Sequence, residues 1–369
     1  MRKELLLLGA FGMLTTATLC AQEFHLQPTP QEYITQKDSV DIPRQYQILS
    51  GNSVQDGPAL PLLRSLMPEE VLGASFRVYI GVKGDKIIKK YQHRIPRKSE
   101  GYFLKIEKDC IVIAGADERG AYYGVQTLAQ LLALDKLPLA EVTDYPDVPY
   151  RGVVEGFYGA PWSQEACIRQ LDFYGRNKMN VYIYGPKDDP YHRTPNWRKP
   201  YPAREGEELK VLVNRAKENN VIFYWAIHPG QDIRWNEEDR SLLLQKFESM
   251  YQLGVRGFAV FFDDISGEGT KADKQAELLN YIDDHFVKVK RDVAPLILCP
   301  TEYNKSWTDV EGGYLTTLGD KLNEGIKVMW TGDMVVATID KSTLDFVNPL
   351  LKRKAYIWWN FPVSDYVQD

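Results

Sequence analysis

Residues 258–264 read Phe-Ala-Val-Phe-Phe-Asp-Asp, an unbroken apolar run that ends in two carboxylates. A short continuous apolar run is typical of a strand buried on both faces, as in parallel sheets. Similar apolar runs occur before and after it, and the starts of successive runs lie 27 to 41 residues apart. This spacing matches repeated βα units and predicts a parallel sheet. Seven runs share this pattern: Val153 to Tyr158, Asn180 to Tyr184, Val221 to Ile227, Phe258 to Phe262, Leu296 to Cys299, Val328 to Thr331 and Tyr356 to Trp359.

The segments between these runs have the apolar periodicity of helices. Apolar stripes at helical spacing lie in 209–216, 243–250 and 278–289. Seven successive units favour a (β/α)8 TIM barrel over an open doubly wound sheet, because no glycine-rich phosphate turn follows the first run. Only residues 360–369 follow the seventh run, so we expect the last barrel unit to be missing from this chain.

The first half of the chain has a different character and predicts a small α+β domain. All eight tryptophans lie from Trp162 onward, and a stretch with prolines and aspartates separates the halves at 135–149. We therefore expect an accessory domain at 22–148 and a catalytic barrel domain at 149–369. Within the accessory domain, the pattern predicts a strand at Phe76 to Val82, a hairpin in Gly101 to Ile113 that turns at Lys108-Asp109, and a helix at Glu118 to Ala133.

The N-terminus has the pattern of a secretory signal at 1–21. Arg2 and Lys3 precede an apolar run from Leu5 to Leu14, and small residues lead to Ala21. The run is shorter than the roughly 20 residues that span a bilayer, so a membrane anchor is the weaker interpretation. We expect an exported protein, either periplasmic or extracellular.

Composition excludes several other classes of protein. The chain has 369 residues, 44% of them hydrophobic and 26% charged, which is close to the globular average and unlike a disordered or coiled-coil chain. The net charge of −5 provides no basic excess to neutralise phosphates, so nucleic acid is not an expected partner. No cysteine pair has the CxxC spacing of a structural zinc site.

The chemistry is expected at the carboxyl ends of the strands, where the active sites of such barrels lie. Asp263 and Asp264 stand there, at the rim of a dry core. Two neighbouring carboxylates do not both ionise without cost, so one is expected to be charged and the other protonated. Cleavage of a glycosidic bond needs this division. The alternative is that the pair simply caps the next helix or begins a loop.

Aromatic residues near the strand ends fit a sugar site, because flat rings pack on the apolar face of a pyranose. Tyr303, Trp358 and Trp359 occupy such positions. Lys187 follows the second run and is either a donor to sugar hydroxyls or an ordinary surface lysine. Single aromatics at these positions are also compatible with the core.

Two competing functions come from other classes. Metal-assisted hydrolysis by His228, Asp263 and Asp264 has weak support, because the five histidines form no HxH or HExxH cluster. We therefore expect no cofactor and no metal. The other alternative is a catalytically silent protein that binds glycans, against which the retained aspartate pair argues.

Three segments together carry a family resemblance. They are Arg151-Gly152-Val153-Val154-Glu155-Gly156-Phe157-Tyr158-Gly159, Tyr182-Ile183-Tyr184-Gly185-Pro186-Lys187-Asp188-Asp189-Pro190-Tyr191 and Phe262-Asp263-Asp264-Ile265. They resemble glycoside hydrolase family 84, the β-N-acetylglucosaminidases that include the O-GlcNAcases. In the first half, Gly124-Val125-Gln126-Thr127-Leu128 is similar to the accessory domain of this family and of the family 20 hexosaminidases.

The resemblance implies a retaining, substrate-assisted mechanism, in which the 2-acetamido oxygen attacks the anomeric carbon and forms an oxazoline. Asp263 then orients the acetamido N–H and stabilises the oxazoline charge, while Asp264 serves as acid and base. Glycans or glycoproteins with β-linked N-acetylglucosamine are the implied partners. By the same matching, Gly156, Lys187, Asn360 and Asp365 hold the sugar hydroxyls, Tyr303 supports the acetamido group, and Trp358 packs beside the sugar.

Two points limit this resemblance. A family 20-like hexosaminidase stays the nearest alternative, although its acid would be Glu after Asp rather than the second Asp of Asp263-Asp264. The chain also ends before the eighth strand and before a further Asn that helps to bind the sugar in family 84. We therefore expect activity only when that segment is supplied.

Overall fold

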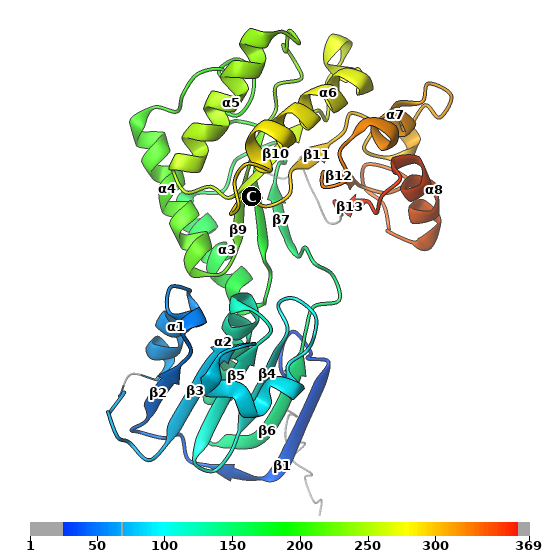
Figure 1. Ribbon diagram of the computed structural model, residues 1–369. Helices are drawn as coiled ribbons and strands as arrows, with labels where there is room; N and C mark the ends of the chain where they lie inside the picture. The colour runs from blue at the N-terminus through cyan, green and yellow to red at the C-terminus, as the bar shows by residue number, and fades with distance from the viewer. Residues whose placement is uncertain (1–24, 68, 361–369) are drawn as a thin grey trace, which may run out of the picture.

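The structure is a computed structural model that describes residues 25–67 and 69–360. The chain forms two lobes, each built around its own β-sheet (Figure 1). The expected signal peptide and Asp365 lie outside the described residues, so both stay predictions. None of the described helices has the length and apolar character needed to cross a bilayer.

The N-terminal lobe contains a mixed six-stranded sheet in the order β1-β6-β4-β5-β3-β2. The predicted strand and hairpin are present as β3, β4 and β5. The stretch at 135–149, expected only to separate the domains, contains β6, which pairs with both β1 and β4. The strands are β1 (Glu32–Val40), β2 (Gln47–Ser50), β3 (Arg77–Val82), β4 (Tyr102–Ile106), β5 (Cys110–Gly115) and β6 (Leu137–Asp144).

Helix α2 (Glu118–Leu132) packs between the two lobes. Its first turn is capped by Asp117, whose side chain accepts a hydrogen bond from the Gly120 amide. One face packs on the N-terminal sheet together with α1 (Ala59–Leu66), and the Tyr122 hydroxyl lies against Gly175 of the second lobe. Residues 120–128 are therefore all buried, although an amphipathic helix on a free surface would expose one face.

The second lobe confirms the expected fold class, an incomplete (β/α) barrel that follows an α+β domain in the chain. Its seven strands form one sheet in chain order from β7 to β13, and every neighbouring pair is parallel. Each strand lies within or beside one of the predicted apolar runs: β7 (Gly152–Glu155), β8 (Val181–Tyr184), β9 (Ile222–Ile227), β10 (Gly257–Phe261), β11 (Ile297–Cys299), β12 (Lys327–Trp330) and β13 (Tyr356–Ile357).

Six α-helices alternate with these strands and cover the outer face of the curved sheet (Figure 1). The expected stripe at 278–289 ends early, because Val289 is exposed beyond a short π-helical turn at Asp283–Val287. The helices are α3 (Gln164–Arg176), α4 (Ala203–Glu218), α5 (Glu237–Gln252), α6 (Ala272–Ile282), α7 (Tyr314–Lys321) and α8 (Lys341–Leu351).

The strands separate two apolar layers, because successive side chains of a strand point to opposite faces. On β10, Phe258 and Val260 pack among the helices, while Ala259 and Phe261 fill the barrel interior. All four side chains are buried. This double burial explains why the run lacks the alternation of a half-exposed strand.

The sheet is open between its first and last strands. Among the described residues, β7 pairs only with β8 and β13 pairs only with β12. A cavity of about 820 Å³ lies between the two edges, lined by residues of both, including Val154, Ile183, Met329 and Trp358. We call this region the seam. At one end of the seam the rings of Tyr150 and Tyr356 meet at 5.1 Å.

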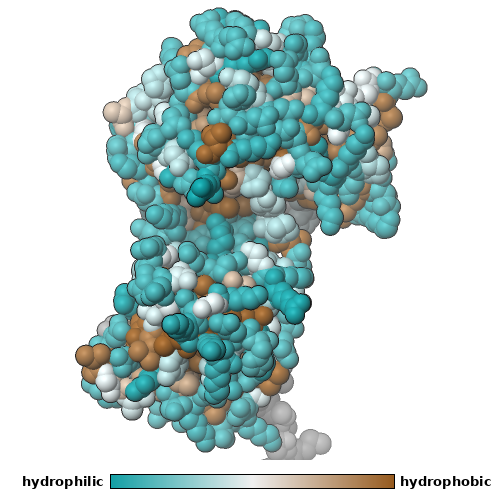
Figure 2. Space-filling model, viewed as in Figure 1, coloured by the Kyte–Doolittle hydropathy of each residue, from teal (hydrophilic) through white to brown (hydrophobic). Residues whose placement is uncertain are grey.

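Buried ion pairs connect the lobes. Lys178 Nζ lies 2.8 Å from both Asp144 Oδ2 and the Tyr102 hydroxyl. Arg151 Nη2 lies 2.6 Å from Glu100 Oε2. Because an unpaired buried charge is costly, these pairs favour one docking geometry between the domains. Figure 2 shows the two lobes beneath a largely hydrophilic surface.

Candidate active site

The two aspartates after β10 have opposite environments although they are adjacent in sequence. Asp263 is 1% exposed, whereas Asp264 is exposed. The difference arises at the backbone, because Asp264 has a φ of 55°, in the left-handed region that residues other than glycine rarely adopt. This turn separates the two carboxylates, with one inside the sheet and one at its rim.

Asp263, after β10, is held by a lysine from the loop after β8, with β9 between the two strands. Lys187 Nζ lies 2.5 Å from Asp263 Oδ2, and both side chains are buried. Burial opposes ionisation of Asp263, but the charge and hydrogen bond of Lys187, with a smaller contribution from nearby His228, outweigh it and hold the pKa of Asp263 well below its usual range. Burial likewise opposes the charge of Lys187, yet Asp263 raises the pKa of that ammonium. The pair is therefore a charged one.

His228, at the end of β9, fixes the backbone of the same aspartate. Its Nε2 lies 2.8 Å from the Asp263 carbonyl oxygen and 3.5 Å from Asp263 Oδ1. Asp263 Oδ1 is buried and has no hydrogen-bond partner among the described residues. One oxygen of a buried, ionised carboxylate is thus free to accept a hydrogen bond.

Asp264 is oriented by two tyrosines from opposite sides. The Tyr303 hydroxyl donates to Oδ1 at 3.0 Å, and the Tyr158 hydroxyl donates to Oδ2 at 3.1 Å. Burial raises the pKa of each tyrosine, so both hydroxyls keep their protons as donors. Tyr303 also packs against Trp358, with ring centroids 5.6 Å apart.

The remaining predicted residues are placed as follows. Gly156 follows β7, and a Cβ atom at this position would contact the Gly185 carbonyl oxygen. The side chain of Asn360 donates to the Val335 carbonyl at 3.0 Å. The exposed Trp359 donates to the Ala337 carbonyl. The structure thus brings Lys187 and Tyr303 to the aspartates, whereas Trp358, beside Tyr303, and Asn360 line the seam.

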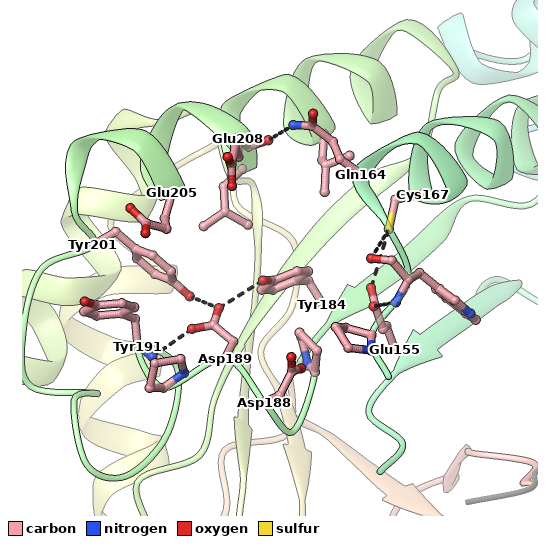
Figure 3. A pocket seen from close by; sticks show the side chains of 16 residues that line it. Glu155, Gln164, Cys167, Tyr184, Asp188, Asp189, Tyr191, Tyr201, Glu205 and Glu208 are labelled. Carbon is pink, nitrogen blue, oxygen red and sulfur yellow. Dashed lines mark hydrogen bonds between the residues drawn. The ribbon is translucent and has the colours of Figure 1, made fainter. Parts of the chain in front are cut away.

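A pocket of about 370 Å³ lies beside the site, between the β7 and β8 loops and α4 (Figure 3). Its centre is Asp189, whose Oδ2 accepts hydrogen bonds from the Tyr184 and Tyr201 hydroxyls at 3.0 and 2.6 Å. Asp189 Oδ1 accepts the Tyr191 amide at 2.7 Å. These contacts fix the β8 loop that carries Lys187.

Sequence reasoning assigned no role to Glu155, His192 or Tyr158. His192 is fully buried, its Nε2 lies 2.8 Å from the Pro186 carbonyl, and its own carbonyl accepts the His228 amide. Tyr158 ends the first apolar run, a position that could have marked it, and His228 was considered only as a metal ligand. No local signal indicates which neighbouring unit each side chain contacts. Among the described residues, no three His, Cys, Asp or Glu side chains are grouped to hold a metal ion.

Comparisons with known proteins show which family the chain resembles. Residues 151–369 match the family model described as β-N-acetylglucosaminidase, and residues 23–145 match domain 2 of glycosyl hydrolase family 20. Protein O-GlcNAcase of Rattus norvegicus is 37% identical over 227 residues, or 59% of this chain and 25% of that protein. The chain thus spans about a quarter of the length of this curated relative.

Two solved structures are similar to the fold. CpGH84B has a TM-score of 0.87 and 36% identity, and the match covers 93% of this chain and 63% of that one. An O-GlcNAc hydrolase mutant of Thermobaculum terrenum has a TM-score of 0.55 and 33% identity, with 59% and 48% covered. The first likeness extends over both lobes.

Proposed function

The chain belongs to the β-N-acetylglucosaminidases of glycoside hydrolase family 84, and on this premise we propose that it hydrolyses terminal β-linked N-acetylglucosamine, including O-GlcNAc on Ser and Thr. The proposed reaction retains configuration and is assisted by the substrate. The 2-acetamido oxygen attacks the anomeric carbon, the glycosidic bond breaks, and an oxazoline forms. Water then opens the oxazoline.

One observation carries this mechanism, namely the free Oδ1 of the ionised Asp263. An acceptor of this kind suits the acetamido N–H, which turns more acidic as its carbonyl oxygen bonds to the anomeric carbon. The negative charge of Asp263 balances the positive charge that develops on the oxazoline. The buried Lys187 keeps Asp263 ionised.

Asp264 is the proposed acid and base. It gives its proton to the departing glycosidic oxygen in the first step and takes one from water in the second. Its exposed position leaves it open to the leaving group, and the hydroxyls of Tyr158 and Tyr303 fix its orientation. Gly156, Lys187, Asn360 and Asp365 are proposed to bind the sugar hydroxyls, and Trp358 to pack beside the ring.

The test measures release of an aryl group from aryl β-N-acetylglucosaminide and from the 2-amino analogue that lacks the acetyl group, with the expected last barrel unit supplied to the chain. We expect hydrolysis only when the acetyl group is present. Saturable binding without hydrolysis of either substrate would favour the glycan-binding alternative. Hydrolysis of both at similar rates would contradict substrate assistance.

Two variants separate the roles of the aspartates. Asp264→Asn should lose about 10²- to 10⁴-fold on poor leaving groups and less on acidic ones, which need little protonation. Asp263→Asn should slow both kinds of substrate by about 10²- to 10³-fold, because the oxazoline charge develops whatever group leaves. Equal losses for both variants on both substrates would contradict the assignment. Asp320→Asn, an exposed aspartate in α7, serves as the control.

A further inference from the structure

Glu155 is a buried acid that the proposed mechanism does not use. It is the last residue of β7 and is 1% exposed. Oε1 accepts the Trp162 amide at 3.1 Å, and Oε2 accepts the Tyr182 hydroxyl. The Cys167 thiol lies 3.8 Å from Oε2 (Figure 3). Each contact gives Glu155 the role of acceptor.

These contacts close a loop that leads to the active site. Residues 156–162 leave β7 after Glu155 and return to its carboxylate at the Trp162 amide. The loop reverses at Gly159, which has a φ of 106°, and the rings of Phe157 and Trp162 pack at 5.2 Å. Both ends of the loop are therefore held at one residue.

The middle of this loop carries the contact with Asp264. Tyr158 donates its hydroxyl to Asp264 Oδ2, yet 44% of the side chain is exposed. Its neighbours at 159–161 are exposed as well. Little apolar burial fixes this part of the loop, so the contacts at the two ends help to set its position, together with the Lys187 ammonium over the Tyr158 ring.

A buried carboxylate is a costly way to close a loop. Desolvation raises the pKa of Glu155 above its usual value, although the hydrogen bonds from Tyr182 and Trp162 favour the charged form. No lysine or arginine of the described residues is ion-paired with it, in contrast to Asp263 and Lys187. A charged carboxylate accepts stronger hydrogen bonds than an amide does, so Glu155 holds its donors more firmly than a glutamine would.

We propose that Glu155 is a positioning residue for the acid and base chemistry of Asp264: it holds both ends of the 156–162 loop so that the Tyr158 hydroxyl reaches the Asp264 carboxylate. This inference rests on the proposed function of Asp264. It assigns to Glu155 an effect on the protonation of the leaving group and none on the oxazoline charge at Asp263.

The test compares Glu155→Gln, Tyr158→Phe and the double variant on phenyl and dinitrophenyl β-N-acetylglucosaminides. Glutamine keeps the size of the side chain but replaces the charged acceptor. We expect Glu155→Gln to lower kcat on the phenyl substrate about 10-fold, the difference between a charged and a neutral hydrogen bond. The dinitrophenyl substrate should lose much less, because its leaving group needs little protonation.

The double variant decides whether the two residues act through one contact. If Glu155 acts through Tyr158, the loss in the double variant equals that of the larger single variant. Losses that multiply, or a Glu155→Gln loss that is equal for both substrates, would overturn the inference. Glu208→Gln, an exposed acid that lines the same pocket, is the matched control and should leave both rates unchanged.

Two further arms keep the test decisive. If Glu155→Gln does not fold, Tyr182→Phe removes one donor and keeps the carboxylate, and a loss confined to the phenyl substrate supports the inference while an equal loss on both overturns it. A wild-type protein, supplied with the expected last barrel unit, that releases no N-acetylglucosamine from either substrate overturns the proposed function and the inference together. If the wild type is active but Glu155→Gln loses the same rate on both substrates, the inference alone is overturned.

Discussion

The central side of the parallel sheet, at β8 to β10, and the seam hold their polar side chains in different ways. Between β8 and β10, the side chains of Lys187, His228 and Asp263 are buried, and Lys187 and His228 both contact Asp263. At the seam, β13 has two residues and pairs on one side, and Asn360 bonds to the Val335 carbonyl. Charges in the middle of the sheet are thus fixed by several strands, whereas the seam residue is fixed by a nearby loop.

The strongest way to break the central side is Lys187→Met. The substitution leaves Asp263 buried without its cation, so the free energy of unfolding should fall by about 3–5 kcal/mol. Urea unfolding at neutral pH, followed by tryptophan fluorescence, measures the change. A double variant, Lys187→Met with Asp263→Leu, should regain much of the loss. A single variant as stable as the wild type would contradict the account of the pair.

Acid should weaken the central side through His192. Burial, together with the charge of nearby His228, lowers the pKa of His192 to about 3, so the folded protein keeps the ring neutral. In the unfolded chain this histidine takes up a proton below about pH 6.5. Its contribution is therefore complete above pH 6.5 and is lost as the pH falls toward 3, by up to about 1.4 kcal/mol per pH unit.

The measurement is the urea midpoint from pH 7 to pH 4 for the wild type and His192→Gln. Glutamine can still donate to the Pro186 carbonyl but does not titrate, so the profile of the variant should be flatter. The exposed His93→Gln provides the control and should keep the wild-type slope. Identical slopes for all three proteins would exclude His192 as the source of acid sensitivity.

The smallest effect is expected at the seam. Asn360→Ala removes one partly exposed hydrogen bond, so stability should change by about 1 kcal/mol or less. If Asn360 binds the sugar, KM for an aryl β-N-acetylglucosaminide should rise several-fold while kcat changes little. A stability loss as large as that of Lys187→Met would erase the distinction between the two sides.

The sequence predicted the parts of the fold that depend on local pattern. Seven apolar runs became seven parallel strands, because burial on both faces leaves a continuous apolar signal. β6 was missed because its residues, Leu137–Asp144, include a proline and two acidic side chains among the apolar ones. Val289 was misassigned because the helix ends in a π-turn before it.

The site was predictable in composition and less so in geometry. The acid pair and Lys187 could be found because they follow strands, and the structure brings them together. The hydrogen bond of Tyr158 to Asp264 could not, since it joins residues 106 positions apart, and no glycine marks the left-handed backbone at Asp264. The roles of Asn360 and Asp365 stay predictions.

The backbone at Asp264 also bears on how the protein can be engineered. A left-handed conformation costs a residue with a side chain roughly 1–2 kcal/mol relative to the usual right-handed one, and glycine escapes this cost. The position that carries the proposed acid is thus one where a glycine would favour thermal robustness. Selection for heat resistance alone would tend to discard the acid, so a screen of variants should score turnover and melting temperature together.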